Sequence, residues 1–180
     1  RFEQEALDIL SKKKNLRVIS ITETKPFDGY NYKRVAGGML VQENDLFAGD
    51  TERKVVTKRA PTGAEMSAME LGWIICKHVK SNAIVLLDAT GTVGVGAGQM
   101  SRVDSVKIAT KMKAYKDTKG CVAASDAFFP FPDGVEELAA AGITAVIQPG
   151  GSIRDNEVIE TADKLGVAMV FSGRRHFRHG

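Results

Sequence analysis

A glycine-rich segment ahead of a predicted helix is the first place where this chain could do chemistry. Gly94, Gly96 and Gly98 lead into a helix that we expect to begin near Ser101 and to carry Arg102 in its first turn. A helix N-terminus offers unpaired N–H groups and partial positive charge, and an arginine can bind an anion through two N–H groups. The spacing fits neither G-x-G-x-x-G nor the P-loop. Two interpretations stay open: an anion-binding site, or a turn that only uses the backbone freedom of glycine.

An aromatic segment over residues 125–133, Ser-Asp-Ala-Phe-Phe-Pro-Phe-Pro-Asp, is the second such place. Three Phe and two Pro between acidic residues favour neither a helix nor a central strand. The segment is either a loop packed against the core or an aromatic wall for a flat heterocycle. In the second case Asp133 would pair with ring N–H groups.

Asn82 and a basic tail are the remaining places where this chain could do chemistry. Asn82 stands at the start of an apolar run, where it either caps a backbone group or donates to a substrate carbonyl, because an unpaired amide is costly there. The tail over residues 173–179 carries three Arg and two His. Such tails are usually solvated. This one follows a predicted buried strand, so we expect it near the ends of the strands, with Arg175 able to grip a phosphate.

Strands and helices alternate through the region that would position these residues. Strands are predicted over 82–87, 92–95, 121–124, 145–147 and 168–171, and helices over 62–79, 101–113, 133–142 and 152–165. Capping boxes, Thr62-Gly-Ala-Glu65 and Asp133-Gly-Val-Glu136, open two of the helices, and the first of these helices should be mostly buried. The alternation predicts an α/β fold, a mixed sheet with helices on its faces.

The first sixty residues carry weaker signals. We expect a helix over 2–10, a strand over 16–21, an extended segment over 33–42 that Gly37-Gly38 interrupts, and a short strand over 54–57. Residue 1 is Arg rather than Met and lies within the helical run. We therefore expect this sequence to be a piece of a longer polypeptide.

The composition excludes several classes of protein. A chain of 180 residues, 43% hydrophobic, suits one compact domain or two small lobes that share a core. No uncharged apolar run reaches the ~18 residues that a membrane span needs, and a net charge of +3 is too small to indicate nucleic-acid binding. Cys76 and Cys121 are too few for a disulfide framework, which favours a cytoplasmic location. Nothing nearby completes a zinc set with Cys76 and His78.

Five motifs occur in one order along the chain: Ser81-Asn82, Gly94–Arg102, Ser125–Phe131, Gln148–Ser152 and Arg175–His179. Together they resemble the C-terminal half of the transformylase region in the bifunctional AICAR transformylase/IMP cyclohydrolase family. The resemblance covers essentially the whole chain, loosely over residues 1–60 and closely over 61–180. It implies a fold similar to that of cytidine deaminase, without the deaminase zinc.

The resemblance also implies an activity. Such enzymes move a formyl group from 10-formyltetrahydrofolate to the amino group of AICAR, a late step of purine biosynthesis. They are cytoplasmic homodimers with active sites at the subunit interface, and they take AICAR and a reduced folate rather than nucleic acid or membrane as partners. Carried onto this sequence, Asn82 would be catalytic, orienting the formyl group and stabilising its oxyanion. Arg102, Phe128 and Arg175 would hold AICAR.

The resemblance places the folate and a metal ion as well. Val103, by its backbone, would hold the folate together with Asp133, Ser152 and Ile153. Some members of the family bind potassium near positions equivalent to Ser81 and Asp126.

Two departures from the family bear on activity. The family has a Lys-His pair whose histidine takes the proton from the attacking amine. The resemblance implies that it lies before residue 1, with the cyclohydrolase domain and the first transformylase lobe. General base catalysis is typically worth about 10²–10⁴-fold, so we expect the isolated chain to be nearly inactive. Pro132 stands where the family often has Arg, which alters the charge beside Asp133.

Two other functions compete with formyl transfer. The first is a non-catalytic nucleotide-binding or interaction module that uses the same glycine turns. The second is RNA binding by the basic tail. The even spread of Lys and Arg, with few aromatic residues between them, disfavours RNA binding.

Overall fold

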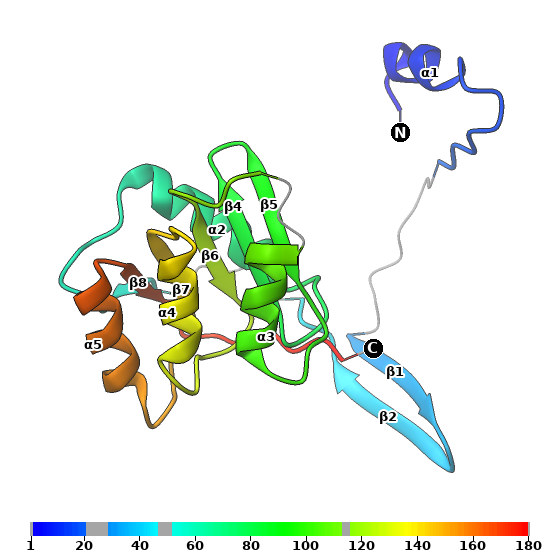
Figure 1. The fold of residues 1–180 in the computed structure, drawn as a ribbon. Coiled ribbons are helices and arrows are strands. Elements are labelled where there is room, and N and C mark those ends of the chain that lie inside the picture. Colours follow the sequence, from blue (N-terminus) through cyan, green and yellow to red (C-terminus); the bar gives the residue numbers. More distant parts are fainter. Residues whose placement is uncertain (1, 21–28, 47–51, 113–115, 180) are drawn as a thin grey trace. The chain divides into compact units, whose positions relative to one another are not determined.

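The structure, a computed structural model, describes residues 2–20, 29–46, 52–112 and 116–179. The chain divides into two compact units, residues 1–46 and residues 47–180 (Figure 1). This division follows contacts within each unit.

The first unit holds one helix and one hairpin. Helix α1 (Gln4–Leu10) confirms the predicted opening helix. Strands β1 (Tyr30–Val35) and β2 (Gly38–Glu43) pair antiparallel, and Gly37 adopts a φ of 79° in the turn between them. The interruption expected at Gly37-Gly38 is therefore a hairpin turn. The predicted strand over 16–21 is wrong for residues 16–20, which are irregular, and residue 21 lies outside the described residues.

The second unit is built on a sheet with the strand order β3-β8-β7-β6-β4-β5. The strands are β3 (Lys54–Val55), β4 (Ile84–Asp88), β5 (Gly91–Gly96), β6 (Val122–Ser125), β7 (Ala145–Gln148) and β8 (Ala168–Phe171). Strands β6, β7 and β8 run parallel. Strand β4 is antiparallel to both β5 and β6, and β3 is antiparallel to β8. The prediction of a mixed sheet is confirmed.

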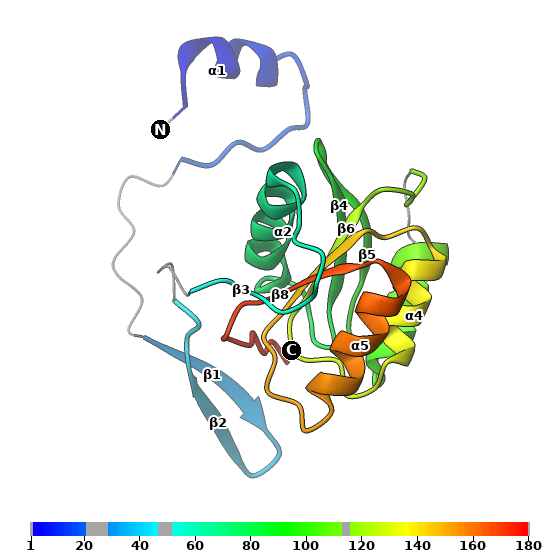
Figure 2. The same ribbon diagram turned by 90° about the vertical axis from the view of Figure 1, so that its left-hand side faces the viewer.

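Helices cover both faces of this sheet. Helix α2 (Gly63–Cys76) lies on one face, and α3 (Arg102–Lys107), α4 (Asp133–Ala140) and α5 (Asp155–Leu165) lie on the other (Figure 2). A π-helical turn (Ile108–Met112) continues α3. Strand β4 shows why the layers form. Ile84 and Leu86 belong to the apolar cluster under α3–α5, whereas Val85 and Leu87 belong to the cluster under α2, as period-two alternation requires.

The helix boundaries confirm one capping box and correct the other. Thr62 and Glu65 form the reciprocal hydrogen bonds of a capping box at the start of α2. In α4 the N-cap is Pro132, and the Asp133 carboxylate accepts from the neighbouring Gly134 N–H at 2.7 Å. The second predicted box is therefore wrong, because Asp133 already lies inside the helix.

Two predicted helices differ from the observed ones in extent or burial. The helix expected from residue 152 begins at Asp155, because the Ser152 hydroxyl accepts from the Arg154 N–H and forms a turn first. Helix α2 is buried on one face only, since Leu71 and Ile74 are exposed. The expectation that it is mostly buried is wrong on the outer face.

Gly96 sets the distance between β5 and α3. A Cβ at this position would collide with the backbone carbonyl of Ser105 in α3. The absence of a side chain therefore lets the helix rest directly on the strand. The Ser105 hydroxyl in turn donates to the Asn82 carbonyl at 2.7 Å, which ties α3 to the segment before β4.

We expect Gly96→Ala to lower the free energy of unfolding by about 2 kcal/mol or more, because overpacking against backbone cannot relax by a rotamer change. Gly63→Ala is the matched control, since a Cβ there meets nothing within 4 Å and lies in the first turn of α2. That change should be neutral or stabilising by up to about 1 kcal/mol. Urea unfolding of both variants measures the difference, and equal midpoints would contradict the explanation.

The start of α2 also carries a strong charge pair. Both oxygens of Glu65 accept from the Arg59 guanidinium at 3.0 Å, and Oε2 accepts from the Thr62 N–H at 2.7 Å. Arg59 further donates to the Gly166 carbonyl, joining the loop before α2 to the end of α5. The hydrogen bonds from Arg59 lower the pKa of Glu65 from 4.5 to about 2.

A carboxyl whose pKa falls on folding stabilises the protein above its unfolded pKa, and the stabilisation is lost as pH falls through the folded value. We expect Glu65→Gln to cost about 1–2 kcal/mol near neutral pH, allowing for the partial exposure of Arg59. The cost should shrink as pH falls from about 4.5 toward 2. Urea unfolding across this range tests it, with Glu160→Gln on the exposed side of α5 as control. A cost that does not change with pH would refute the assignment.

Candidate functional site

A cavity of about 450 Å³ lies where β4 begins, β6 ends and α3 begins. Four segments line it: Asn82, residues 100–103, residues 127–133 without 132, and the tail residues Arg175 and Phe177. Six of the eight expected AICAR, folate and catalytic contacts are among the lining residues, namely Asn82, Arg102, Val103, Phe128, Asp133 and Arg175. The other two, Ser152 and Ile153, are not, and Ile153 is fully exposed.

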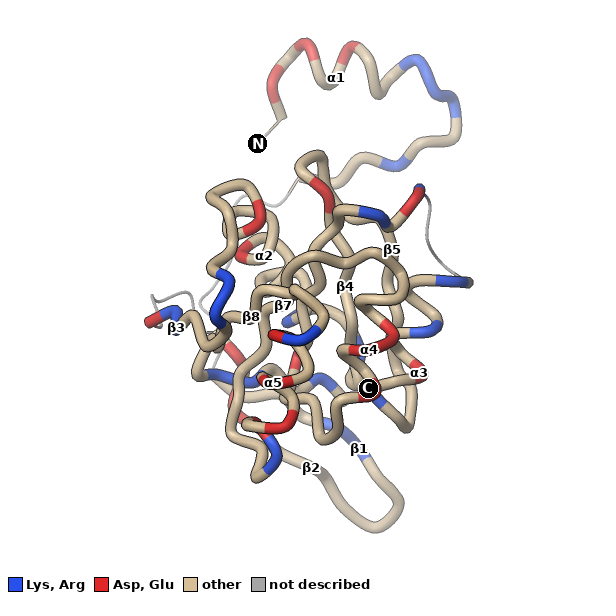
Figure 3. Tube along the Cα trace, turned by 60° about the vertical axis from the view of Figure 1, so that its left-hand side comes forward, with Lys and Arg blue, Asp and Glu red and all other residues tan. Residues whose placement is uncertain are grey.

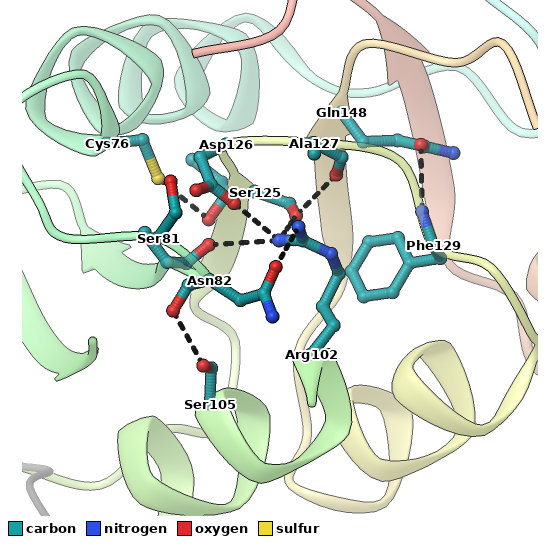
Figure 4. A network of polar contacts seen from close by, with 12 residues as sticks. Cys76, Ser81, Asn82, Arg102, Ser105, Ser125, Asp126, Ala127, Phe129 and Gln148 are labelled. Atoms are coloured by element: carbon teal, nitrogen blue, oxygen red, sulfur yellow. Dashed lines mark hydrogen bonds and ion pairs between the residues drawn. The ribbon is translucent and has the colours of Figure 1, made fainter. Parts of the chain in front are cut away.

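Arg102 is the centre of the polar network beside this cavity (Figure 4). Its Nη1 donates to Asp126 Oδ1 at 2.5 Å and to the Ser125 hydroxyl at 2.8 Å, and its Nη2 donates to Asn82 Oδ1 at 2.9 Å. The side chains of Arg102 and Asp126 are 6% and 1% exposed. Two charges removed from water to this degree require each other and further hydrogen bonds, so Arg102 is committed to the protein rather than free for an anion.

Asn82 is held through both ends of its amide. Its oxygen accepts from Arg102, and its nitrogen donates to the backbone carbonyls of Gln99 at 3.0 Å and Met100 at 3.3 Å. The amide thus caps backbone groups, one of the two roles considered from the sequence. A substrate oxygen would have to replace one of these carbonyls, and the longer bond to Met100 is the weaker one.

The glycine-rich segment is strand as far as Gly96, which extends the strand predicted over 92–95 and corrects the expectation of a turn at Gly96. Gly94 and Gly96 lie in β5, and Gly98 alone of the three has a positive φ, 69°. Ser101 caps α3 through its hydroxyl, so Arg102 and Val103 lie in the first turn as predicted. Close packing of α3 on β5, rather than approach of a ligand, explains Gly96.

The aromatic segment combines both interpretations considered from the sequence. Phe129 is fully buried in the core under α4, and Gly134 leaves room for its ring. Phe128 and Phe131 line the cavity as well, and Phe129 borders it from the core side. The Arg154 guanidinium lies 4.9 Å from the centre of the Phe131 ring, so the turn before α5 reaches the cavity wall although Ser152 and Ile153 do not line it.

The basic tail is fixed to the sheet. The His176 N–H donates to the Asp126 carbonyl at 2.7 Å, and Ser81 and Arg178 exchange two hydrogen bonds of 2.9 and 3.0 Å. Arg175 lines the cavity with its guanidinium 4.6 Å from the centre of the Phe177 ring. No ion pair of Arg175 occurs within the described part of the chain, so its charge is available to an anion.

Gln148 is a residue to which sequence reasoning gave no role. It is fully buried at the end of β7, where its Oε1 accepts from the N–H groups of Phe129 and Gly150, each at 3.3 Å. It therefore joins the aromatic segment to the loop before α5. The signal was present in the sequence, because a polar amide that ends an apolar strand must find partners.

Neither Cys76 nor Cys121 is among the residues that line the cavity. Among the described residues, no three or more His, Cys, Asp or Glu gather to hold a metal ion. Burial raises the pKa of the Cys76 thiol far above its usual value, and the thiol donates to the Ala124 carbonyl at 3.2 Å. Cys76 is thus a protonated core residue.

No helix in the described ranges has the length and apolarity to cross a bilayer.

Comparison with known proteins decides the family. A family model described as "AICARFT/IMPCHase bienzyme" matches residues 1–112. The chain belongs to this family. The resemblance inferred from the five motifs is confirmed, while the likeness to the cytidine deaminase fold remains a proposal.

Curated relatives extend the match beyond residue 112. The chain is 56% identical to the bifunctional purine biosynthesis protein PurH of Sorangium cellulosum and 54% identical to that of Lysinibacillus sphaericus, in each case over 99% of this chain and 35% of the relative. The PurH of Chlorobium phaeovibrioides is 56% identical over 99% of this chain and 34% of the relative. The chain thus spans about a third of the length of these relatives, and the match includes the cavity residues from 127 onward.

The buried ion pair makes a prediction about coupling. Arg102→Met should cost about 3–5 kcal/mol of unfolding free energy, because it leaves the Asp126 charge buried without its partner. In a double-mutant cycle with Asp126→Asn, the double variant should lose about 2 kcal/mol less than the sum of the single variants.

The exposed pair Lys111–Glu137, 64% and 30% exposed, is the control. Its cycle, Lys111→Met with Glu137→Gln, should be close to additive, because solvent screens an exposed pair. Urea unfolding measures both cycles. Additive behaviour at Arg102 and Asp126 would show that the network does not act as a unit.

Proposed function

We propose that this chain supplies part of the active site of a folate-dependent formyltransferase, which moves a formyl group from 10-formyltetrahydrofolate to the amino group of AICAR in purine biosynthesis. One observation carries the proposal. Asn82, Phe128 and Arg175, from three distant segments, line one cavity in a chain whose family description names this activity. The relatives are named bifunctional purine biosynthesis proteins, which supports a place in purine biosynthesis.

The cavity suits the chemistry of AICAR, a flat imidazole that bears a carboxamide, an amine and a ribose phosphate. Phe128 offers a ring face to the heterocycle. Arg175, exposed and without an ion pair in the described ranges, would bind the phosphate. Arg102 would contact AICAR only through the edge of a guanidinium that already binds three side chains. Its main part would be to fix Asn82.

In the proposed reaction the AICAR amine attacks the formyl carbon and forms a tetrahedral intermediate. The amine then loses its proton, the bond from the formyl carbon to N10 of the folate breaks, and N10 takes up a proton. The Asn82 amide would donate to the oxyanion of the intermediate in exchange for its bond to Met100. The proton acceptor would come from outside residues 1–180.

The folate would lie along the part of the cavity formed by Val103 and Asp133. The turn with Ser152 and Ile153 would contact the same folate, because the adjacent Arg154 already touches Phe131 in the cavity wall. Pro132, next to Asp133, lies at the start of α4 and leaves the Asp133 carboxylate in place.

A homodimer and a bound potassium ion belong to the same proposal. Met100 and Ile153 are fully exposed and Phe131 is 50% exposed, so a second copy could cover these apolar side chains near the cavity. For potassium, Asp126 Oδ2 is buried and has no hydrogen-bond partner in the described residues (Figure 4). Ser81 and Asp126 both hold the tail, Ser81 through Arg178 and Asp126 through the His176 N–H. A cytoplasmic location follows from the proposed pathway.

One observation favours a non-catalytic nucleotide-binding module instead. Both hydrogens of the Asn82 amide are already bonded to backbone carbonyls, as a purely structural residue would have them. Such a module would bind AMP as well as AICAR and without dependence on folate. RNA binding finds no support, because the tail is tied to the sheet and charges of both signs are interspersed along the second unit (Figure 3).

The test is a chimaera in which this chain replaces the segment that it matches in the Sorangium cellulosum relative. We expect the chimaera to release tetrahydrofolate from 10-formyltetrahydrofolate in the presence of AICAR, within about tenfold of the parent rate. Asn82→Ala should reduce the rate by about 10²–10³-fold, as loss of an oxyanion donor does. The chain alone should be slower than the chimaera by about 10²-fold or more.

Asn156→Ala, an exposed asparagine on α5, is the matched control and should leave the rate unchanged. Exchange of potassium for sodium in the same assay tests the ion. Full turnover by the Asn82→Ala chimaera would refute the catalytic role, and full turnover by the isolated chain would refute the shared active site.

A further inference from the structure

The tail reaches the cavity without forming a helix or a strand. Arg175 and Phe177 line the cavity, whereas His176 between them is 1% exposed and its ring centre lies 4.4 Å from that of Trp73 in α2. Alternate residues of an extended chain point in opposite directions. The place where His176 is held therefore decides where Arg175 points.

Trp73 is itself held by a charge pair. The Arg53 guanidinium lies 4.2 Å from the centre of the Trp73 ring. Both oxygens of Glu70, one turn earlier on α2, accept from Arg53, at 2.5 and 2.7 Å. Arg53 Nη1 also donates to the carbonyl of Ser172, the first residue after β8, at 3.4 Å. We name Arg53, Glu70 and Trp73 the α2 brace, because they meet the tail at Ser172 and again at His176.

The other side of the tail is fixed by its backbone. The His176 N–H donates to the carbonyl of Asp126, whose carboxylate holds Arg102. One aspartate therefore anchors both arginines that line the cavity, Arg102 through its side chain and Arg175 through the backbone of the next residue. The backbone bond fixes the height of the tail, and the tilted ring contact with Trp73, at an interplanar angle of 48°, restricts its rotation.

We propose that Trp73, supported by Arg53 and Glu70, is a positioning residue that aims Arg175 at the phosphate of the nucleotide substrate from the far side of the sheet. Trp73 is absent from the cavity lining and contacts the tail at His176, so it acts on Arg175 indirectly. The proposal rests on the proposed function for the identity of the nucleotide, but not for the brace itself.

The test compares binding of AICAR and of its phosphate-free nucleoside to the 180-residue chain by calorimetry. The dissociation constant of the nucleoside divided by that of AICAR measures what the phosphate contributes to binding. Trp73→Ala should reduce this ratio about 5–10-fold, a large part of what a charge-assisted hydrogen bond contributes, and should leave nucleoside binding within about twofold. Trp73→Phe, which keeps an aromatic ring for His176 to contact, should have a ratio close to that of the unaltered chain.

Met69→Ala is the control, because Met69 is fully buried one turn earlier on α2 but has no ring to offer to His176. It should lower stability and leave the ratio unchanged. A second readout needs no ligand: hydrogen exchange at the His176 amide should quicken in Trp73→Ala about tenfold more than in Met69→Ala.

The outcomes separate the two proposals. Equal exchange at His176 in the Trp73→Ala and Met69→Ala variants would overturn the brace. Where the unaltered chain prefers AICAR to the nucleoside, an unchanged binding ratio in Trp73→Ala would overturn it as well. If the unaltered chain shows no preference for AICAR over the nucleoside while the His176 exchange responds as expected, the brace stands and the assignment of Arg175 to the phosphate fails.

Discussion

The buried ion pair between Arg102 and Asp126 is the constraint on which the site depends. Each charge has left water, and each would destabilise the fold alone, so the start of α3 and the end of β6 must meet. The remaining donors of Arg102 reach Ser125 and Asn82, which brings the segment before β4 to the same point. Three segments far apart in sequence are thereby held at one edge of the sheet.

The sheet topology makes this meeting possible. Strand β4 lies antiparallel between β5 and β6, so the start of β4 is next to the end of β6. Gly96 lets α3 lie directly on β5, and Gly134 lets α4 lie against the Phe129 ring. Both helices therefore start close to the cavity and present Val103 and Asp133 to it. Small residues at the contacts between layers are part of how the site is built.

The two arginines that line the cavity differ in what they can do. Arg102 is buried and shared among Asp126, Ser125 and Asn82, so it shapes the site. Arg175 is exposed and stacks beside Phe177, so it can meet a negatively charged ligand. The cavity thus has one positive charge that is paired within the protein, on Arg102, and one that can pair with a ligand, on Arg175. Together with the neighbouring aromatic rings, this suits a nucleotide. This agrees with the family to which the chain belongs.

The sequence by itself determined the α/β class, most strands of the sheet, the capping box at Thr62 and the family, because apolar periodicity, local hydrogen bonding and ordered motifs are written in neighbouring residues. Through the motifs rather than through any geometric argument, it also identified six residues of the cavity lining: Asn82, Arg102, Val103, Phe128, Asp133 and Arg175. Only the tertiary structure decided what those residues do there. It extended the predicted strand through Gly96, paired Arg102 with Asp126, gave Gln148 its hydrogen-bond partners, and placed His176 against Trp73. Each of these contacts joins residues distant in sequence, and burial of charge and packing of layers, which act only in the folded chain, select the partner.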